Sequence, residues 1–211
     1  MTLPMKKLFA LLLTVCALAG CQSAPQDAPP SALDVIMTRT SIRSFTGEAI
    51  PREALETILK AGMAAPSAIN IQPWRFVVVT DQEKIAEVFG QGPRSGMFTS
   101  AGAVIVVCGE TTAMRKPWGE PDAPEEKQDN IFWYEDCSAA AENILLAAHA
   151  LGYGAVWTAG YPAMERIAPV CAALDIPEGV LPLCIIPVGI PAENPEPKDK
   201  WKPENIHWEQ W

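Results

Sequence analysis

Four short segments carry residues whose types and spacing could serve ligand chemistry. The first is Arg39-Thr40-Ser41-Ile42-Arg43-Ser44-Phe45, which places two cations and two hydroxyl groups within five residues. Arginine makes planar, bidentate contacts to phosphate, and Ser or Thr adds further donors. The alternative is a solvated turn whose cations stabilise the end of a helix through its dipole. The spacing of these residues favours neither interpretation over the other.

The second segment runs from Ala65 to Arg75 and joins a predicted helix to a predicted strand. It contains Ser67, Asn70 and Gln72, whose side chains donate to and accept from the edge of a heteroaromatic ring. The alternative is a loop whose polar groups cap the preceding helix.

The third segment, residues 152–160, places glycines on both sides of a short predicted strand. Glycine allows the backbone to approach a flat ligand closely. The segment lacks the G-x-G-x-x-G pattern and follows a helix, which excludes a Rossmann site. The alternative is a helix C-cap followed by a tight turn.

The fourth segment, residues 198–202, is a basic cluster in an acidic tail and contains Lys198 and Lys200. Its distance in sequence from Arg39 does not prevent the two from meeting in space. The alternative is a solvated linker.

Hydrophobic periodicity predicts the elements that must position these segments. The class is α+β, with one sheet of four to five strands flanked by helices. Residues 111–130 are polar and Pro-rich and predict a long excursion, typical of a lid or a pocket wall. Pro182 and Pro187 predict a bulge or an edge position for the last strand. Helices are expected over 31–39, 51–63, 136–151 and 163–171 and after 80–83, and strands over 75–80, 103–110, 155–158 and 181–190.

The composition limits the functions that the segments can serve. The chain has 211 residues and a formal charge of −9, and it is long enough to fold without disulfides or a metal. The acidic balance argues against nucleic-acid binding, which needs clustered Lys and Arg. No metal site is expected, because the two His are far apart and lack neighbouring ligands. Cysteines in apolar patterns favour buried free thiols: Cys108, Cys137, Cys171 and Cys184.

The first 30 residues have the pattern of an export segment. A Lys pair precedes the apolar stretch Leu8–Leu18, which is too short to span a bilayer comfortably. Residues 18–21 are similar to a bacterial lipobox, and this resemblance implies cleavage after residue 20 and lipid attachment to Cys21. Residues 21–30 then form a tether. We therefore predict an exported lipoprotein, lipid-anchored to the bacterial cell envelope membrane; a plain signal peptide with a chance cysteine is the alternative.

In their order and spacing the four segments resemble the FMN-dependent nitroreductase family. The similarity rests on TRTSIRSF at 38–45, APSAINIQPWRFVVV at 65–79, EDCSAAAENILLAAHALGYGAVWTAG at 135–160 and the basic tail. It implies a nitroreductase-like FMN-binding domain over 31–211, with a central, mainly antiparallel sheet. It also implies an intertwined homodimer with C-terminal tail exchange.

The resemblance assigns residues to FMN. Its R-x-S-x-R stretch implies that Arg39, Thr40 and Ser41 hold the phosphate and ribityl chain and that Arg43 lies near N1 and O2, where a guanidinium stabilises negative charge. Some members carry an acid where this chain has Ala159, and a second cation where only Arg94 is available. The other implied contacts are Pro66, Ser67, Ala68 and Asn70, in part from the other subunit, Trp157, Thr158, Ala159 and Gly160 along the ring, and Lys198 and Lys200 at the phosphate.

The resemblance further implies ping-pong hydride transfer through flavin N5, from NAD(P)H or another donor to nitroaromatic or quinone-like acceptors. No acidic or basic side chain is required, because the cofactor carries the chemistry. The aromatic residues Trp118, Phe132, Trp133 and Tyr134 are expected to shape the acceptor pocket. Since NAD(P)H is not normally present outside the inner membrane, an exported enzyme would need another donor, such as a quinol. Two alternatives stay open: a lipid-tethered binding module without turnover, and a reductive dehalogenase on the same fold.

Overall fold

A computed structural model describes residues 30–211, and Ser31–Trp211 form one compact unit. The predicted signal peptide (1–20) and tether (21–30), apart from Pro30, lie outside the described residues. Among residues 30–211, none of the helices combines the length and the apolar character needed to cross a bilayer.

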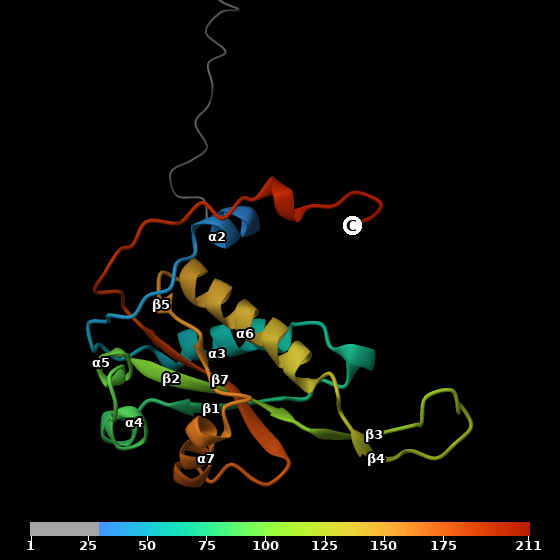
Figure 1. Ribbon diagram of the computed structural model, residues 1–211. Coiled ribbons are helices and arrows are strands. Elements are labelled where there is room, and N and C mark those ends of the chain that lie inside the picture. The colour runs from blue at the N-terminus through green and yellow to red at the C-terminus, as the bar shows by residue number, and fades with distance from the viewer. Residues whose placement is uncertain (1–29) are drawn as a thin grey trace, which may run out of the picture. The chain divides into compact units, whose positions relative to one another are not determined.

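A five-stranded sheet forms the centre of the unit (Figure 1). Its strands follow the order β1-β2-β7-β5, and β6 also pairs with β7. Every strand pair in this sheet is antiparallel, so the predicted α+β fold with a mainly antiparallel sheet is confirmed. The strands are β1 (Trp74–Val79), β2 (Ala103–Glu110), β5 (Gly154–Ala155), β6 (Thr158–Ala159) and β7 (Val180–Gly189).

Helices cover both faces of the sheet, with α3 and α6 on one side and α4 and α7 on the other (Figure 1). Strand β2 shows why its sequence is continuously apolar: Ile105 and Val107 pack towards α6, while Val104 and Val106 pack towards α4 and α7. A strand buried on both faces needs no polar alternation. The helices are α2 (Ala32–Thr38), α3 (Arg52–Met63), α4 (Gln82–Phe89), α5 (Ser95–Thr99), α6 (Trp133–Ala150) and α7 (Met164–Ala173), with short 3₁₀ turns η2 (Ala68–Asn70) and η3 (Pro203–Asn205).

The prolines of β7 produce the predicted bulge, but the strand is not at an edge. Val107 pairs with Cys184 whereas Cys108 pairs with Pro182, so the register shifts at this point. β7 nevertheless lies between β2 and the short strands β5 and β6, so the edge prediction is wrong. The expected strand 155–158 is interrupted, and the register places the interruption opposite Pro187. Proline has no N–H to offer a neighbour, which accounts for the break.

The excursion after β2 contains a second, two-stranded sheet that the sequence did not predict. Strands β3 (Thr112–Arg115) and β4 (Glu126–Asp129) form an antiparallel hairpin. The N–H of Asn130 donates to Thr111 O at 2.8 Å and closes its base. The hairpin projects away from the central sheet (Figure 1).

Candidate functional site

The segment Arg39–Thr46 has almost no regular structure of its own and is held by neighbours from distant parts of the chain. The N–H of Ile42 donates to Ala155 O in β5 at 3.1 Å, and the N–H of Thr46 donates to Ile190 O at 3.0 Å. Ile42 and Phe45 are buried, while Arg43 and Ser44 between them are exposed. The apolar residues therefore anchor the segment and leave the arginine free to meet a ligand.

A cavity of about 480 Å³ brings together five of the predicted site residues. Volumes of this size are typical of small-molecule sites. Two arginines and a Trp contribute to the wall, and no carboxylate does. The interruption between β5 and β6 supplies Val156 and Trp157. The lining residues are Arg43, Pro93, Arg94, Gly96, Met97, Val156, Trp157, Thr158 and Ala159.

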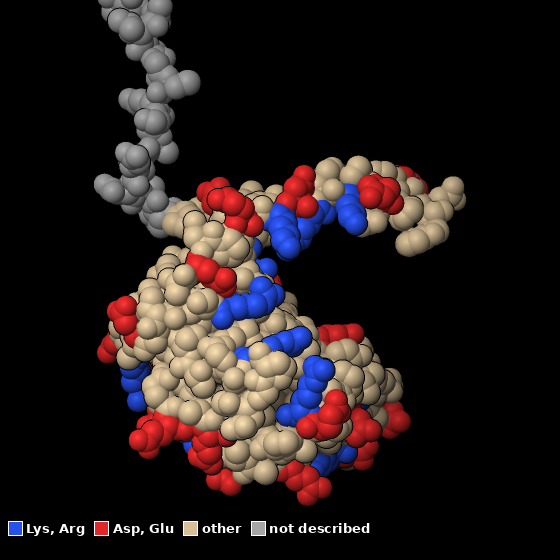
Figure 2. Space-filling model, turned by 60° about the vertical axis from the view of Figure 1, so that its left-hand side comes forward, with Lys and Arg blue, Asp and Glu red and all other residues tan. Residues whose placement is uncertain are grey.

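Arg39 lies between two further cavities. One, of about 180 Å³, is lined by Thr40, His149 and Glu193 among others; the second, of about 590 Å³, is lined by Lys198 and Lys200 of the tail. The tail cations thus meet Arg39 in space, as the sequence allowed. Figure 2 shows Lys and Arg side chains following one another from the C-terminal tail across this face.

The Arg39 guanidinium already has an acidic neighbour. Its Nε lies 3.6 Å from Glu142 Oε1, and the two side chains are 17% and 51% exposed. The predicted alternative of a helix-end cation is partly right, since Arg39 directly follows α2.

His149, in the last turn of α6, lines the same cavity as Thr40. Its Nε2 lies 2.9 Å from Thr38 Oγ1, which itself donates to Asp34 O at 2.6 Å. Partial burial, and then the charge of Arg39, lower the pKa of His149. The imidazole is therefore neutral at pH 7 and donates to Thr38.

The loop that carries Ser67 and Asn70 lies in a different place. Ile69, Asn70 and Gln72 have φ angles of 44°, 60° and 55°, a left-handed region that costs a β-branched residue such as Ile69 most. Two hydrogen bonds hold this shape: Ala68 N–H donates to Asp136 Oδ1 at 2.9 Å, and Gln72 N–H donates to Ser67 Oγ at 3.0 Å. The Ser67 hydroxyl therefore supports the loop itself rather than capping α3.

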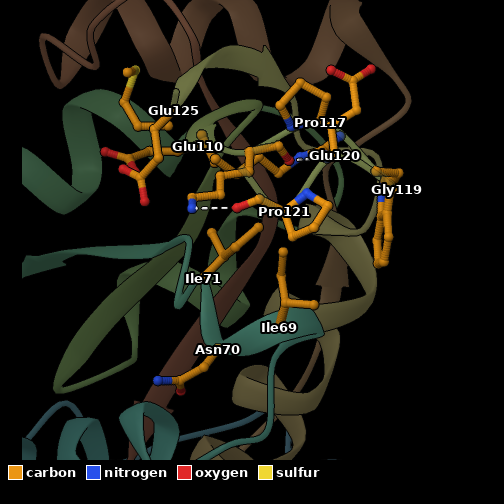
Figure 3. A pocket seen from close by; sticks show the side chains of 14 residues that line it. Ile69, Asn70, Ile71, Glu110, Pro117, Gly119, Glu120, Pro121 and Glu125 are labelled. Atoms are coloured by element: carbon orange, nitrogen blue, oxygen red, sulfur yellow. Dashed lines mark hydrogen bonds between the residues drawn. The ribbon is translucent and has the colours of Figure 1, made fainter. Parts of the chain in front are cut away.

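This loop lines a cavity of about 730 Å³ under the β3–β4 hairpin (Figure 3). Ile69 and Ile71 point towards Pro121 of the hairpin, while the Asn70 amide points the other way. Trp118, which is expected to shape the acceptor pocket, also lines this cavity. Within one chain, therefore, Asn70 and Arg43 line two separate cavities.

Other residues named from the sequence lie outside these cavities or in the core of the unit. Gly160 is buried and its N–H donates to Leu183 O at 2.9 Å, so this N–H is not available to a ligand. Gly152 has φ of 82° and ends α6, as in the C-cap alternative. Trp133 is a core residue that packs against Gly109. Pro66, Ser67, Ala68 and Ser41 line none of these cavities.

Three carboxylates that support these segments were not predicted from the sequence. Glu142 pairs with Arg39, Glu193 accepts from the backbone at Arg43 and Ser44, and Asp136 accepts from Ala68. Each contact joins residues far apart in sequence. Asp136 and Glu142 both belong to the long helix α6, whereas Glu193 lies in the tail.

The four cysteines of the described chain are free. Burial raises the pKa of both Cys108 and Cys137 to about 12, and burial holds the pKa of Cys184 well above its usual value. These thiols are packing residues, and none is a nucleophile at neutral pH.

The structure thus combines an antiparallel α+β sheet with a cavity at its interrupted edge whose charged lining residues are Arg43 and Arg94. The chain belongs to the nitroreductase family, whose sequence pattern it matches over residues 36–94 and 88–190.

Proteins similar to this chain support that assignment. A protein of Methanothermobacter thermautotrophicus with the provisional name NADH dehydrogenase/NAD(P)H nitroreductase is 40% identical over 179 residues, covering 85% of this chain and 87% of its own. A crystal structure of a Bacteroides thetaiotaomicron protein with the same provisional name is 40% identical, with a TM-score of 0.75, covering 87% of this chain and all of its own. A nitroreductase structure from Desulfovibrio desulfuricans, solved in complex with FMN, is 30% identical, with a TM-score of 0.68, covering 87% of this chain and 99% of its own.

Proposed function

We propose that this chain transfers electrons by a ping-pong cycle from NAD(P)H or another donor to nitroaromatic or quinone-like acceptors. At the coarser level the chain is an FMN-dependent NAD(P)H oxidoreductase of the nitroreductase family. FMN, when bound, would supply the hydride and two-electron transfer chemistry, and this chain's residues would hold and orient it.

The single observation that carries the proposal is the cavity lined by Arg43, Arg94 and Trp157. Its donors are cationic, one wall is aromatic and none of its lining residues is acidic, so it fits the pyrimidine end of a flavin, which carries carbonyl acceptors and gains negative charge on reduction. Arg39, Lys198 and Lys200 around the neighbouring cavities fit a phosphate. The residues present therefore match the two ends of FMN.

We assign separate work to each group. Arg43 and Arg94 stabilise negative charge that develops at N1 and O2, because fixed guanidinium groups need no reorganisation there. Arg39 exchanges its contact with Glu142 for the phosphate. Trp157, which lines the same cavity, would exclude water from bound FMN.

The second wall of the site comes, in our proposal, from a second copy of the chain. Asn70 and the hairpin line a cavity apart from Arg43, and members of this family are typically homodimers with small-molecule substrates. Large apolar side chains that are exposed in one chain support an interface. They include Leu33, Ile36 and Met37 of α2 and Trp201, Trp208 and Trp211 of the tail.

We also propose that the enzyme is exported and lipid-anchored through Cys21. Support comes from the sequence pattern of residues 1–30 alone. Under this proposal the donor in the cell is a quinol or another flavoprotein rather than NAD(P)H.

An absorbance spectrum tests the proposed function. Residues 22–211, purified and loaded with FMN, should show oxidised-flavin bands that bleach when NADH or NADPH is added without oxygen. Bands that bleach only with dithionite would support a flavoprotein with a different donor. Protein that binds no FMN even in excess would refute the proposed site.

The Arg43→Ala variant tests the assignment of the cavity, with Arg52→Ala as a matched control. Arg52 begins α3 and pairs with Glu56 on an exposed helix surface. We expect FMN affinity to fall about tenfold or more in Arg43→Ala and to stay unchanged in Arg52→Ala. Equal affinity in both variants would contradict the assignment.

A further inference from the structure

The start of the C-terminal tail pairs with the segment that carries Arg43. Thr46 N–H donates to Ile190 O at 3.0 Å, and Ala192 N–H donates to Ser44 O at 2.9 Å. Phe45 and Pro191 form the bridge between these two bonds. Neither bond uses a donor from Pro191, so this proline does not weaken the pairing.

Beyond Ala192 a side chain takes over from the backbone. The carboxylate of Glu193 accepts from the N–H of Arg43 and, at 3.1 Å, from the N–H of Ser44. One oxygen, Oε1, receives both bonds. Bonds from N–H groups to an ionised carboxylate are stronger than bonds between neutral groups. Glu193 therefore ends this pairing as a cap and fixes the peptide that carries Arg43.

Glu193 also lies between the two parts of the proposed FMN site, the phosphate end and the ring end. It lines the cavity of Arg39 and Thr40, while Arg43 lines the cavity of Arg94 and Trp157. The chain then runs through Pro195 and Pro197, which stiffen it, to Lys198 beside Arg39. None of the ion pairs formed by residues 30–211 includes Glu193, so its recorded partners are the two backbone N–H groups.

We propose that Glu193 is a positioning residue for flavin binding: its carboxylate caps the Arg43–Ser44 backbone and ties the tail to it, which fixes Arg43 at the flavin cavity. The inference rests on the proposed placement of FMN. It assigns no contact between Glu193 and the ligand. Since Glu193 is negative, a direct role beside the phosphate would weaken binding, whereas a positioning role strengthens it.

The two roles predict opposite results for Glu193→Ala. We expect the dissociation constants of FMN and of riboflavin each to rise about tenfold, since loss of a charge-assisted hydrogen bond commonly has this effect. Riboflavin lacks the phosphate. An equal loss of affinity for both ligands would therefore show that the weakened contacts are those to the flavin ring, where we place Arg43. Glu193→Gln keeps an acceptor oxygen and should restore most of the affinity.

Glu196→Ala is the matched control. Glu196 lies three residues further along the same tail, is exposed, and takes part in none of the hydrogen bonds or ion pairs recorded for the described chain. The Glu196→Ala substitution removes the same charge from the same segment as Glu193→Ala does. We expect its affinity for both ligands to equal that of the parent.

A measurement without ligand keeps this inference separate from the FMN site. Amide hydrogen exchange at Arg43 and Ser44 in the flavin-free chain should be about tenfold faster in Glu193→Ala than in the parent or in Glu196→Ala. Faster exchange with unchanged flavin affinity would overturn the positioning role. Unchanged exchange, tighter FMN binding, or failure of Glu193→Gln to restore affinity would overturn it as well. Failure of the parent to bind FMN would refute the proposed site instead.

Discussion

The close packing of Gly154 against Ile42 gives a quantitative test of how β5 sets the position of the Arg43 segment. A Cβ built on Gly154 would lie 2.7 Å from both Cβ and Cγ2 of Ile42 and 2.8 Å from Cγ1. Ordinary carbon contacts start near 3.5 Å, so Gly154→Ala requires a shift of about 0.8 Å, that is 3.5 − 2.7. Ile42 is buried, and the backbone fixes the position of its Cβ, so a change of the side-chain rotamer does not relieve the clash.

We expect Gly154→Ala to lower the free energy of unfolding by about 2–3 kcal/mol, at the upper end for overpacking. For a chain of this length the loss corresponds to about 4–12 °C in Tm. The shift also moves Arg43, the next residue, and should weaken FMN binding by about tenfold or more. Urea denaturation of the flavin-free chain and a fluorescence titration with FMN measure the two effects.

Gly96→Ala is the control for unfolding. A Cβ there would meet nothing within 4 Å, and Gly96 lies in helix α5, so its stability should be equal to the parent or slightly higher. Ile42→Ala removes two of the three crowded carbons and should partly rescue Gly154→Ala, with a coupling of about 0.5–3 kcal/mol. Additive effects of the two substitutions, or full FMN affinity in Gly154→Ala, would refute the reasoning.

Three further predictions concern groups that titrate or are buried. Burial and the charge of Arg39 lower the pKa of His149, so its contribution to stability is complete above about pH 6.5 and falls as the pH drops below that value. The His149→Gln variant should therefore lose this part of the pH dependence of stability, measured by urea denaturation between pH 5 and 8. An unchanged profile would show that His149 is not the source of that dependence. Since burial raises the pKa of Cys108 and Cys137 to about 12, both thiols should resist Ellman's reagent at pH 8 in the folded chain and react after denaturation; rapid native labelling at either position would contradict the buried placement. Asp136→Ala should lower stability by about 1–3 kcal/mol because it leaves the Ala68 N–H without its acceptor, while Asp136→Asn should cost much less, and equal losses in the two variants would argue against the hydrogen bond.

The sequence predicted the parts of the fold whose pattern is local. Strand β2 matches its prediction, because a run buried on both faces is apolar throughout. The hairpin strands were missed because β4 reads Glu-Lys-Gln-Asp and has no apolar face. The break between β5 and β6 lies opposite Pro187, which is more than 25 residues away in sequence. Such pairings are set by tertiary register and leave no local signal.

The candidate site shows the same division between residues whose local pattern predicts them and contacts that depend on distant parts of the chain. Arg43, Arg94 and Trp157 were named from residue type and resemblance, and they line one cavity. Gly160 packs against Ile167 in the structure, and a glycine that admits a ligand and a glycine that admits a side chain look alike in sequence. Glu193 could not be found, since an isolated Glu in a Pro-rich tail has the pattern of a solvated linker, and Asp136 and Glu142 could not be found because their partners are far away in sequence.

The rigidity of the Arg39–Thr46 segment is therefore supplied from outside it. Ile42 is bound to β5, Thr46 to the end of β7, and Arg39 to α6. These three partners come from different elements, so movement of any one of them changes the distance between the two arginines. A cationic site made by an irregular segment needs such support, because unsupported side chains lose more entropy when a ligand binds. The tail adds a fourth attachment through Glu193, which makes the C-terminal segment part of the site rather than an appendage.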